Sequence, residues 1–401
     1  MRYSGRMVAA RNYVVRNAHI VPITAKAFNG SLVVTEGRIA DLGSDVVVPD
    51  GHEVIDADGG WLLPGLIDAH VHLGVHEEGE GWAGADFNET TDPVTAAARA
   101  LDAVNPNDTG FDDALANGVT TVNVNPGSAN PIGGLTVALK TFGAVVDDMV
   151  LRSPSGLKAA LGENPKRVYG EQKKAPGTRL GVALTVRKAF AEARHWAAKP
   201  HEERDADLVS EALTQVLNRE IPWRQHCHRA DDIATAIRIA DEFGYELVLD
   251  HGTEAYKLAD RIAARGIPVL YGPLMVSRSK VEVRERTPRG PGLLTQAGVK
   301  VSIITDHPVV PIDFLITQAA LAVREGMDPQ EALKAVTINP AEVLGVADRV
   351  GSLETGKDAD LVLWSADPLD TRNRVLRTWV SGAQVYTFDS SSGLGTVTSR
   401  W

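Results

Sequence analysis

The middle of the chain alternates short apolar strands with amphipathic helices, and this alternation constrains the fold more than any other feature. Residues 231–243 show helical spacing of apolar side chains, stop at a glycine, and are followed by the apolar run 246–250. Residues 258–264 and 267–270 repeat that order, and residues 298–304 form one more buried run. Repeated strand–helix units predict a parallel sheet covered by helices. Periodicity alone does not distinguish a closed barrel from an open, doubly wound sheet.

Bulk composition narrows the class of protein. The 401 residues are 44% hydrophobic and 23% charged, which is typical of a folded chain. The formal net charge of −11 argues against a nucleic-acid partner, because such a partner needs a surplus of cations to neutralise its phosphates. Cys227 is the only cysteine, so the chain can form neither an internal disulfide nor an all-thiolate zinc site.

Targeting and membrane signals are missing from the sequence. Residues 1–15 lack the apolar core and cleavage site of a signal peptide. No run approaches the roughly 18 uncharged apolar residues that a membrane span needs. The sequence therefore predicts a cytoplasmic protein with no membrane partner, and it leaves self-association into a homo-oligomer open.

The sharpest motif is a His-x-His pair at the end of an apolar run. Leu66 and Ile67 belong to a buried strand that ends with His70 and His72. Side chains two apart on a strand point the same way, so both imidazoles can face one point. Neutral imidazole is a common ligand of zinc-like metals. A bare His-x-His is equally typical of a polar strand end on a surface, so the interpretation depends on partners elsewhere.

Three later strand ends offer such partners. They carry His226 and His228, His251, and Asp306 respectively. Taken singly, each is more often a satisfied polar residue than a ligand. Four strand ends that all offer His or Asp, in a chain with 11 histidines, argue against coincidence. In a barrel, such ends converge on the C-terminal face, where active sites lie.

Two stretches of the chain resemble the signature of the amidohydrolase superfamily. One is Gly-Gly-Trp-Leu-Leu-Pro-Gly-Leu-Ile-Asp-Ala-His-Val-His-Leu at residues 59–73. The other is Ala-Val-Thr-Ile-Asn-Pro-Ala at residues 335–341, continued by Gly-Ser-Leu-Glu-Thr-Gly-Lys-Asp-Ala-Asp-Leu-Val at residues 351–362. The order of motifs is similar to the branch that contains imidazolonepropionases and barrel-type prolidases. The resemblance spans nearly the whole chain.

The resemblance implies a fold and a division of the chain. It implies an α/β fold, with a (β/α)8 TIM barrel of the metal-dependent hydrolase type over residues 63–346. Residues 1–62 together with residues 347–401, both rich in short β runs and turns, are expected to form one small β-sandwich. Residues 76–113 and 278–292 have the composition of long loops, which in a barrel lie on the active-site face.

The resemblance also implies a role for each matched position. The implied metal ligands are His70 and His72 on the first strand, His226 on the fifth, His251 on the sixth and Asp306 on the eighth. His228 points to the same side as His226 and is expected to contact substrate. Asp306 is expected to act also as the proton shuttle. One or two divalent ions are implied, zinc by preference, with manganese or iron as alternatives.

The fourth strand offers two candidates for a ligand that bridges two ions. Lys158 resembles the lysine that several branches carboxylate with CO2, and Glu163 resembles the bridging glutamate of other branches. An unmodified lysine cation is no metal ligand, so the two options differ in chemistry. Lys158 as a carbamate is the preferred bridge and Glu163 is the alternative.

The implied function is hydrolysis of a C–N bond in a cyclic amide or a small peptide-like amide. A bound divalent metal lowers the pKa of its water to about 7. Asp306 would pass the proton of that water to the leaving nitrogen, while a second metal, His228 or His251 polarises the carbonyl group. Lys140, Arg167 and Tyr169 could bind a substrate carboxylate, with a surface role as the default for each.

Two rival functions stay open. A deaminase on the same scaffold needs a glutamate near the fifth strand, and no glutamate adjoins His226 in the sequence. A non-catalytic barrel that serves as an assembly module is the other rival. Such proteins usually lose metal ligands, and none of the expected set is missing here.

Overall fold

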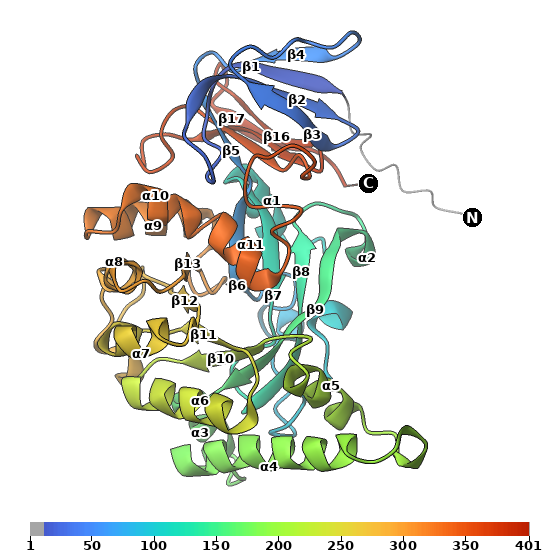
Figure 1. Cartoon of the computed structure of the whole chain (residues 1–401), viewed down its shortest axis with the longest axis vertical. Helices are drawn as coiled ribbons and strands as arrows, with labels where there is room; N and C mark the ends of the chain where they lie inside the picture. The colour runs from blue at the N-terminus through green and yellow to red at the C-terminus, as the bar shows by residue number, and fades with distance from the viewer. Residues whose placement is uncertain (1–11, 401) are drawn as a thin grey trace.

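The computed structural model describes residues 12–400, which form two sheets and a set of surrounding helices (Figure 1). One sheet is built from both ends of the chain, and the other is a nearly closed barrel formed by the middle of the chain. The prediction that residues 1–15 carry no signal peptide falls largely on residues 1–11, which lie outside the described residues.

The terminal segments share one nine-stranded sheet, which we call the composite sheet. Its strands are β1 (Tyr13–Ile20), β2 (Phe28–Thr35), β3 (Arg38–Gly43), β4 (Glu53–Asp56), β5 (Trp61–Pro64), β14 (Leu361–Trp364), β15 (Val375–Val380), β16 (Ala383–Asp389) and β17 (Leu394–Val397). The order is β17-β16-β15-β14-β5-β1-β2-β3, with β4 paired to β1. The antiparallel pairing of β5 with β14 joins the two ends of the chain.

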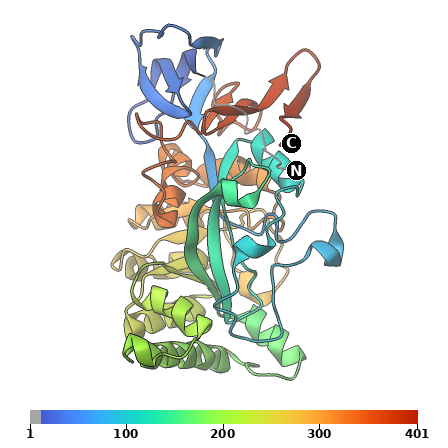
Figure 2. The same ribbon diagram turned by 90° about the vertical axis from the view of Figure 1, so that its right-hand side faces the viewer.

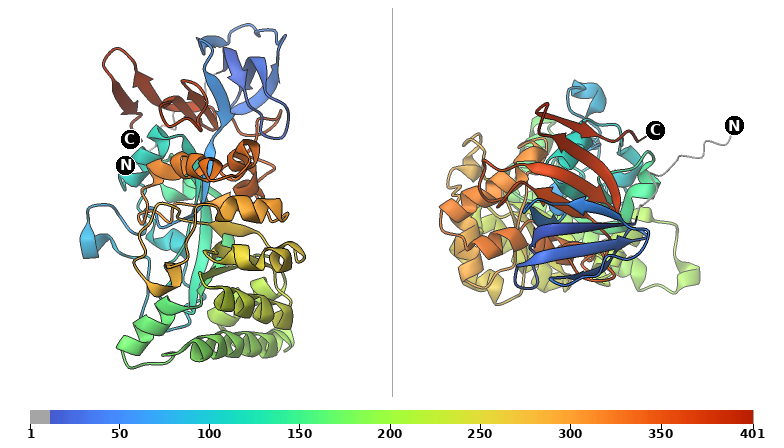
Figure 3. Two further views of the ribbon diagram at one scale, coloured as in Figure 1. Left: turned by 90° about the vertical axis from the view of Figure 1, so that its left-hand side faces the viewer. Right: turned by 90° about the horizontal axis from the view of Figure 1, so that it is seen from above.

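The composite sheet has a hydrophobic core of its own. Buried side chains from both chain ends, among them Val15, Leu32, Leu361 and Trp379, belong to one cluster. Seen from above, the composite sheet covers one end of the barrel (Figure 3). The expectation of a separate β unit made from both termini is confirmed, and its boundaries at residues 62 and 347 stay a prediction.

The middle of the chain forms an eight-stranded barrel. Its strands are β6 (Leu66–Val71), β7 (Val119–Val124), β8 (Ile132–Lys140), β9 (Val150–Ala160), β10 (Trp223–Cys227), β11 (Leu247–His251), β12 (Val269–Tyr271) and β13 (Val301–Ile303). They follow one another in chain order around the sheet. The expected α/β barrel is confirmed.

One strand of the barrel runs against the others. β8 pairs antiparallel with both β7 and β9, while the remaining neighbours in the sheet are parallel. The chain therefore returns directly from β7 through β8 to β9 instead of crossing over through a helix. An antiparallel strand needs only a short connection, whereas a parallel one needs a crossover of a dozen or more residues.

Backbone hydrogen bonds between the ends of β6 and β13 close the ring. The Asp306 N–H donates to the His70 carbonyl at 3.2 Å, and the His72 N–H donates to the His307 carbonyl at 2.8 Å. These bonds place the ends of the first and last barrel strands side by side.

Helices cover the outer side of the barrel (Figures 1 and 3). They are α1 (Gly110–Ala116), α2 (Val146–Met149), α3 (Glu163–Glu171), α4 (Arg179–Ala197), α5 (Leu208–Leu217), α6 (Ala230–Phe243), α7 (Ala259–Ala263), α8 (Gly290–Gln296), α9 (Leu315–Arg324), α10 (Pro329–Lys334) and α11 (Ile338–Leu344). As predicted, α6 ends at Gly244, whose φ of 77° gives the left-handed conformation that glycine adopts at helix ends. Among the described residues, no helix is both long and apolar enough to traverse a lipid bilayer.

Two long connections lie at the C-terminal ends of the barrel strands, as expected. The one after β6 contains short 3-10 helices at Gly81–Gly84 and Ala100–Ala103, and it projects from the side of the barrel in Figure 2. The one after β12 contains a 3-10 helix at Val281–Val283. We call residues 272–289 of this second connection the β12 loop.

A buried ion pair fastens the barrel to the composite sheet. Lys140, the last residue of β8, lies 3.2 Å from Asp358 and also contacts Asp360, just before β14. All three side chains are less than a tenth exposed. Both the surface role expected by default for Lys140 and the alternative of substrate binding are wrong, because its ammonium group is enclosed between these two carboxylates.

We expect Lys140→Met to lower the free energy of unfolding by about 3 kcal/mol, because it leaves buried carboxylates without their cation. Lys300→Met is the matched control, since Lys300 pairs with Glu342 on the surface and such pairs contribute about 0–1 kcal/mol. Urea unfolding of both variants measures the difference. Equal losses in the two variants would contradict a structural role for the Lys140 pair.

Candidate metal centre

The first and last barrel strands bring two histidines against one carboxylate. His70 and His72 come from the end of β6, and the Nε2 atom of each lies 3.3 Å from Oδ1 of Asp306. The hydrogen bonds that close the barrel fix this approach, because they join the backbones of the same residues. His70 is fully buried and Asp306 is partly exposed toward the mouth of the barrel.

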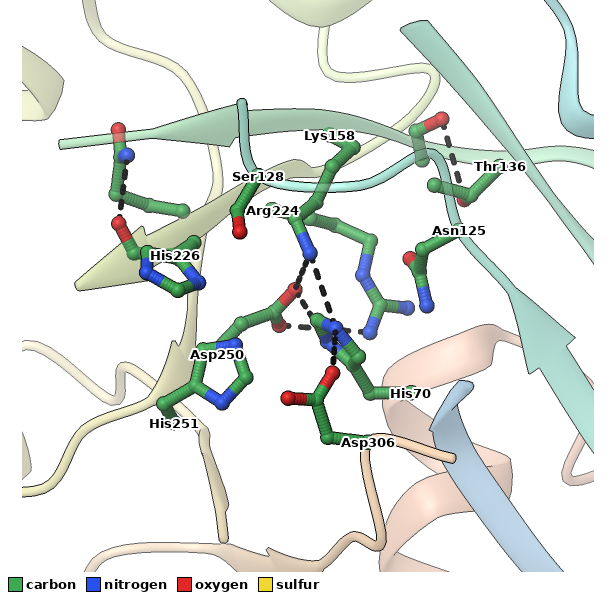
Figure 4. A network of polar contacts seen from close by, with 12 residues as sticks. His70, Asn125, Ser128, Thr136, Lys158, Arg224, His226, Asp250, His251 and Asp306 are labelled. Carbon is green, nitrogen blue, oxygen red and sulfur yellow. Dashed lines mark hydrogen bonds and ion pairs between the residues drawn. The ribbon is translucent and has the colours of Figure 1, made fainter. Parts of the chain in front are cut away.

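Two groups of possible ligands share one histidine. His70, His251 and Asp306 offer atoms within 4.8 Å of one another, and so do His226, His228 and His251. Figure 4 shows His70, His226, His251 and Asp306 arranged around a common space. The structure therefore brings together the residues that the sequence placed at four separate strand ends, including His228.

In most of these histidines the Nδ1 atom, which we call the outer ring nitrogen, is hydrogen-bonded to another group of the protein. Nδ1 of His72 lies 2.8 Å from the Asn125 carbonyl, and Nδ1 of His251 lies 3.0 Å from the Gly272 carbonyl. Nδ1 of His228 lies 2.7 Å from Oγ1 of Thr253. A partner on Nδ1 fixes the orientation of the ring and leaves Nε2 free for a metal ion, as in known metal sites.

The Nδ1 atoms of His70 and His226 have different surroundings. Nδ1 of His70 lies 2.9 Å from Oδ2 of Asp250, which gives the carboxylate–histidine arrangement typical of metal ligands. Nδ1 of His226 is buried and has no hydrogen-bond partner in the described part of the chain. A buried ring nitrogen without a partner is costly, and a cation bound at Nδ1 of His226 would remove that cost. The donor set fits a divalent cation.

Burial keeps the imidazoles neutral. It lowers the pKa of His226, His228 and His251 well below the usual histidine value, and neighbouring positive charges add to this effect. Burial also acts to raise the pKa of Asp306, yet His251 and the other facing histidines hold it well below its usual range. Neutral imidazoles beside an ionised carboxylate are the protonation states that bind a metal ion.

The structure places the two bridging candidates differently. Lys158 is fully buried in β9, and its Nζ lies 3.0 Å from Nε2 of His70. Glu163 is the first residue of α3, is partly buried, and uses its backbone N–H to bond Glu282. Burial lowers the pKa of Lys158 to about 8, although Asp250 and Asp306 act in the opposite direction.

Asp250 and Arg224 belong to the same buried network, and sequence reasoning missed both. Asp250 lies 3.8 Å from Nζ of Lys158 and 3.4 Å from Nη2 of Arg224 (Figure 4). Burial acts to raise the pKa of Asp250, but Arg224, His70 and Lys158 hold it far below its usual range. A lysine in a buried strand, such as Lys158, needs an opposite charge nearby. That requirement is the signal in the sequence that could have led to Asp250.

Local backbone geometry explains why Asp250 escaped notice. Consecutive strand residues point to opposite faces, so Asp250 and His251 should not share one side of the sheet. His251 has a φ of 70° and Asp306 a φ of 55°, both in the left-handed region that such residues seldom adopt. This break in the strand conformation lets Asp250 and His251 both face the barrel interior.

Glu282 is the second residue that sequence reasoning missed. It belongs to the β12 loop and is almost fully buried. Its Oε1 lies 3.7 Å from Nε2 of His228 and 4.0 Å from Nε2 of His226. The expectation that no glutamate lies near His226 is therefore wrong, because the fold supplies one from a distant loop.

A cavity of about 460 Å³ opens onto these residues. Its walls include His72, His226, His228 and Asp306, together with residues of the β12 loop. A volume of this size suits a small molecule. A larger hollow of about 830 Å³ lies at the opposite end of the barrel, beside the residues that precede β10, β11 and β12, and it contains none of these histidines.

We expect Asp250→Asn to weaken zinc binding about 10- to 100-fold, because Asp250 orients His70 and balances the buried cations. Competition with a chromophoric chelator measures the affinity. Asp241→Asn is the control, since Asp241 is exposed on α6 and pairs with Arg265. Equal zinc affinities for the two variants would show that Asp250 does not support the centre.

Comparisons with known proteins agree with this geometry. Residues 61–385 match the model of the amidohydrolase family. The crystal structure of an amidohydrolase from Thermotoga maritima MSB8 has a TM-score of 0.91 and 45% sequence identity, and the match covers 93% of this chain and 99% of that one.

Two curated relatives are more distant. Imidazolonepropionase from Cupriavidus necator is 29% identical over 407 residues, which cover 88% of this chain and 89% of that protein. The amidohydrolase tasK from Hapsidospora irregularis is 28% identical over 388 residues, and the match covers 88% of this chain but only 39% of tasK. The family match spans the whole barrel and strands β5, β14 and β15 of the composite sheet, and the chain belongs to the amidohydrolase family.

Proposed function

We propose that this protein hydrolyses a C–N bond of a small peptide-like or cyclic amide with the help of one or two divalent metal ions. The observation that supports it best is the convergence of five strand-end histidines and Asp306, of which three histidines and Asp306 line one cavity, with Nδ1 of four of the histidines already hydrogen-bonded. Zinc is the preferred ion for such a donor set, with manganese or iron as alternatives.

The ligand groups divide naturally between two positions. His70, His72 and Asp306 would hold one ion, and His226 and His251 would hold the other. A divalent cation at such a centre supplies Lewis acidity and lowers the pKa of a coordinated water to about 7. His228 lies close enough to the second group to be an additional ligand or to face the substrate.

Lys158 is our choice for the bridge between the two positions. The ammonium group would first lose one proton; the neutral amine would then attack the carbon of CO2 and lose a second proton to water, which leaves an anionic carbamate. The low pKa of Lys158 favours the neutral amine that this reaction needs. Its contact with His70 also places it at the centre, whereas Glu163 lies at the start of α3.

Asp306 and His228 would carry the proton and charge transfers. Asp306 is ionised and faces the cavity, so it can accept a proton from the attacking water and deliver it to the leaving nitrogen. His228 is neutral and also lines the cavity. A hydrogen bond from its Nε2 would stabilise the negative charge that develops on the carbonyl oxygen.

A deaminase is the second candidate function, and Glu282 is the observation that favours it. Glu282 lies beside His226 and His228, where a deaminase needs an acid. His228 and Lys280 nevertheless outweigh burial and lower its pKa, so Glu282 is ionised rather than ready to donate a proton. We therefore rank amide hydrolysis first. A cytoplasmic location and a homo-oligomeric state stay predictions from the sequence.

The decisive experiment is a screen of dipeptides, N-acyl amino acids, cyclic ureides, lactams and aminopurines with Zn²⁺ or Mn²⁺. We expect amide hydrolysis that Asp306→Asn lowers by about 100- to 10,000-fold, because the proton transfer is lost. Asp241→Asn should keep full activity. Full turnover of Asp306→Asn would contradict the proton-shuttle role, and ammonia release from aminopurines alone would favour the deaminase. A protein that retains no metal would favour a non-catalytic barrel.

The carbamate on Lys158 has its own test. At constant dissolved CO2, we expect incorporation of ¹³C from bicarbonate to increase from about pH 7 to about pH 9, because the amine loses its proton near its lowered pKa. Below that pKa the ammonium form has no lone pair for CO2. Carbon NMR of wild type and Lys158→Met measures the signal. An equal signal in Lys158→Met, or none in wild type, would contradict the carbamate.

A further inference from the structure

The β12 loop forms the wall of the cavity beyond the histidines, and it contributes two cations. Lys280 and Arg286 both line the cavity, together with small polar residues such as Ser277 and Ser279. Asp306 is the only carboxylate that lines this cavity among the described residues, and it belongs to the metal centre. The β12-loop side of the cavity is thus positively charged.

Lys280 is already neutralised by the protein. Its Nζ lies 2.8 Å from Oε1 of Glu282 and 3.1 Å from Oδ1 of Asn164. Asn164 in turn donates to Oγ of Ser128 at 2.8 Å. Lys280 therefore helps to hold the β12 loop over the barrel, and its positive charge is balanced by Glu282 within the protein.

Arg286 has no such partner. No carboxylate of residues 12–400 lies within ion-pair distance of its guanidinium group. Its Nη1 donates to the Leu274 carbonyl at 3.4 Å, and its Nε is buried without any hydrogen bond. A partly buried cation with an unused donor is unfavourable by itself, and an anion in the cavity would satisfy it.

The position of Arg286 is fixed by its neighbours in the β12 loop. The Tyr271 hydroxyl donates to the Thr287 carbonyl at 3.0 Å, and Lys257 lies 2.6 Å from Glu285. These bonds hold the residues on both sides of Arg286. Because the flanking residues are held, the loop loses little entropy when Arg286 binds an anion.

We propose that Arg286 binds a free carboxylate of the substrate, so that the substrate is an amide that also carries a carboxylate, such as an N-acyl amino acid or a dipeptide. This inference rests on the proposed function, because it places the scissile amide at the metal centre. A planar guanidinium matches a carboxylate through two parallel hydrogen bonds. The cavity of about 460 Å³ can hold both groups of one small molecule.

The other side chains that could bind a carboxylate are less suited. Lys140 is enclosed by Asp358 and Asp360 at the composite sheet. The Tyr169 hydroxyl is committed to the Asp92 carbonyl and to Asn130. Arg286 combines access to the cavity with the lack of a counter-ion.

The test compares N-acetyl amino acids with their neutral carboxamides on the metal-loaded protein. The readout is KM for compounds that are hydrolysed and Kd from calorimetry for those that are not. We expect Arg286→Met to weaken the carboxylates about 10- to 100-fold and to leave the carboxamides unchanged. Arg284→Met is the matched control, because Arg284 lies in the same loop but is exposed. It should change neither class.

The outcomes separate the two proposals. Selective weakening of carboxylates in Arg286→Met supports the inference, even if no amide is hydrolysed and the proposed function fails. Equal weakening of both classes, or no weakening, overturns the inference, even if amides are hydrolysed. An absence of carboxylate binding in wild type also overturns it. If Arg286→Met does not fold, Arg286→Gln, which keeps polarity without charge, is judged by the same criteria.

Discussion

The candidate metal centre depends on the closure of the barrel between its first and last strands. In an open sheet, β6 and β13 would be the two outermost strands, and their side chains could not meet. The backbone bonds between the His70 and Asp306 positions, and between His72 and His307, remove that separation. The same bonds set the distance of the two β6 imidazoles from Asp306. The composite sheet then covers one end of the closed ring, with Lys140 as the buried link.

Beneath the centre, the barrel interior is a balanced set of buried charges. Lys158 and Arg224 are cations without access to water, and Asp250 is the anion that both of them approach. Asp250 also holds His70, so the balance of charge and the orientation of a ligand depend on one carboxylate. Buried charges without partners are strongly unfavourable, which explains why these groups occur together. The arrangement leaves the metal centre electrostatically prepared before any ion binds.

The β12 loop decides what the centre can reach. Glu282 approaches the histidines at the end of β10, and Lys280 forms an ion pair with Glu282. Arg286 lies beside the cavity without an ion-pair partner, and its Nε has no hydrogen bond. The strands therefore determine the type of chemistry, while this loop determines the charge of the molecule that can occupy the cavity. Such a division is expected for a barrel, because its strand ends are rigid and its loops vary.

The sequence by itself determined the strand–helix order, the composite sheet from both termini, and the strand ends that carry His70, His72, His226, His251 and Asp306. The strand–helix order and the polar strand ends follow from local periodicity and from the position of polar residues after apolar runs, whereas the joining of the two termini was implied by the resemblance to the amidohydrolase superfamily. It could not reveal the reversed direction of β8, because an apolar strand looks alike in either direction. Nor could it reveal Asp250, Glu282 or Arg286. Asp250 lies on the inward face of β11 that Val248 already occupies, but only a positive φ turns the adjacent His251 inward as well, and the two loop residues reach the cavity through a segment without periodicity. Tertiary structure decided these points, because only the closed ring and the folded loop bring distant charges within contact of one another.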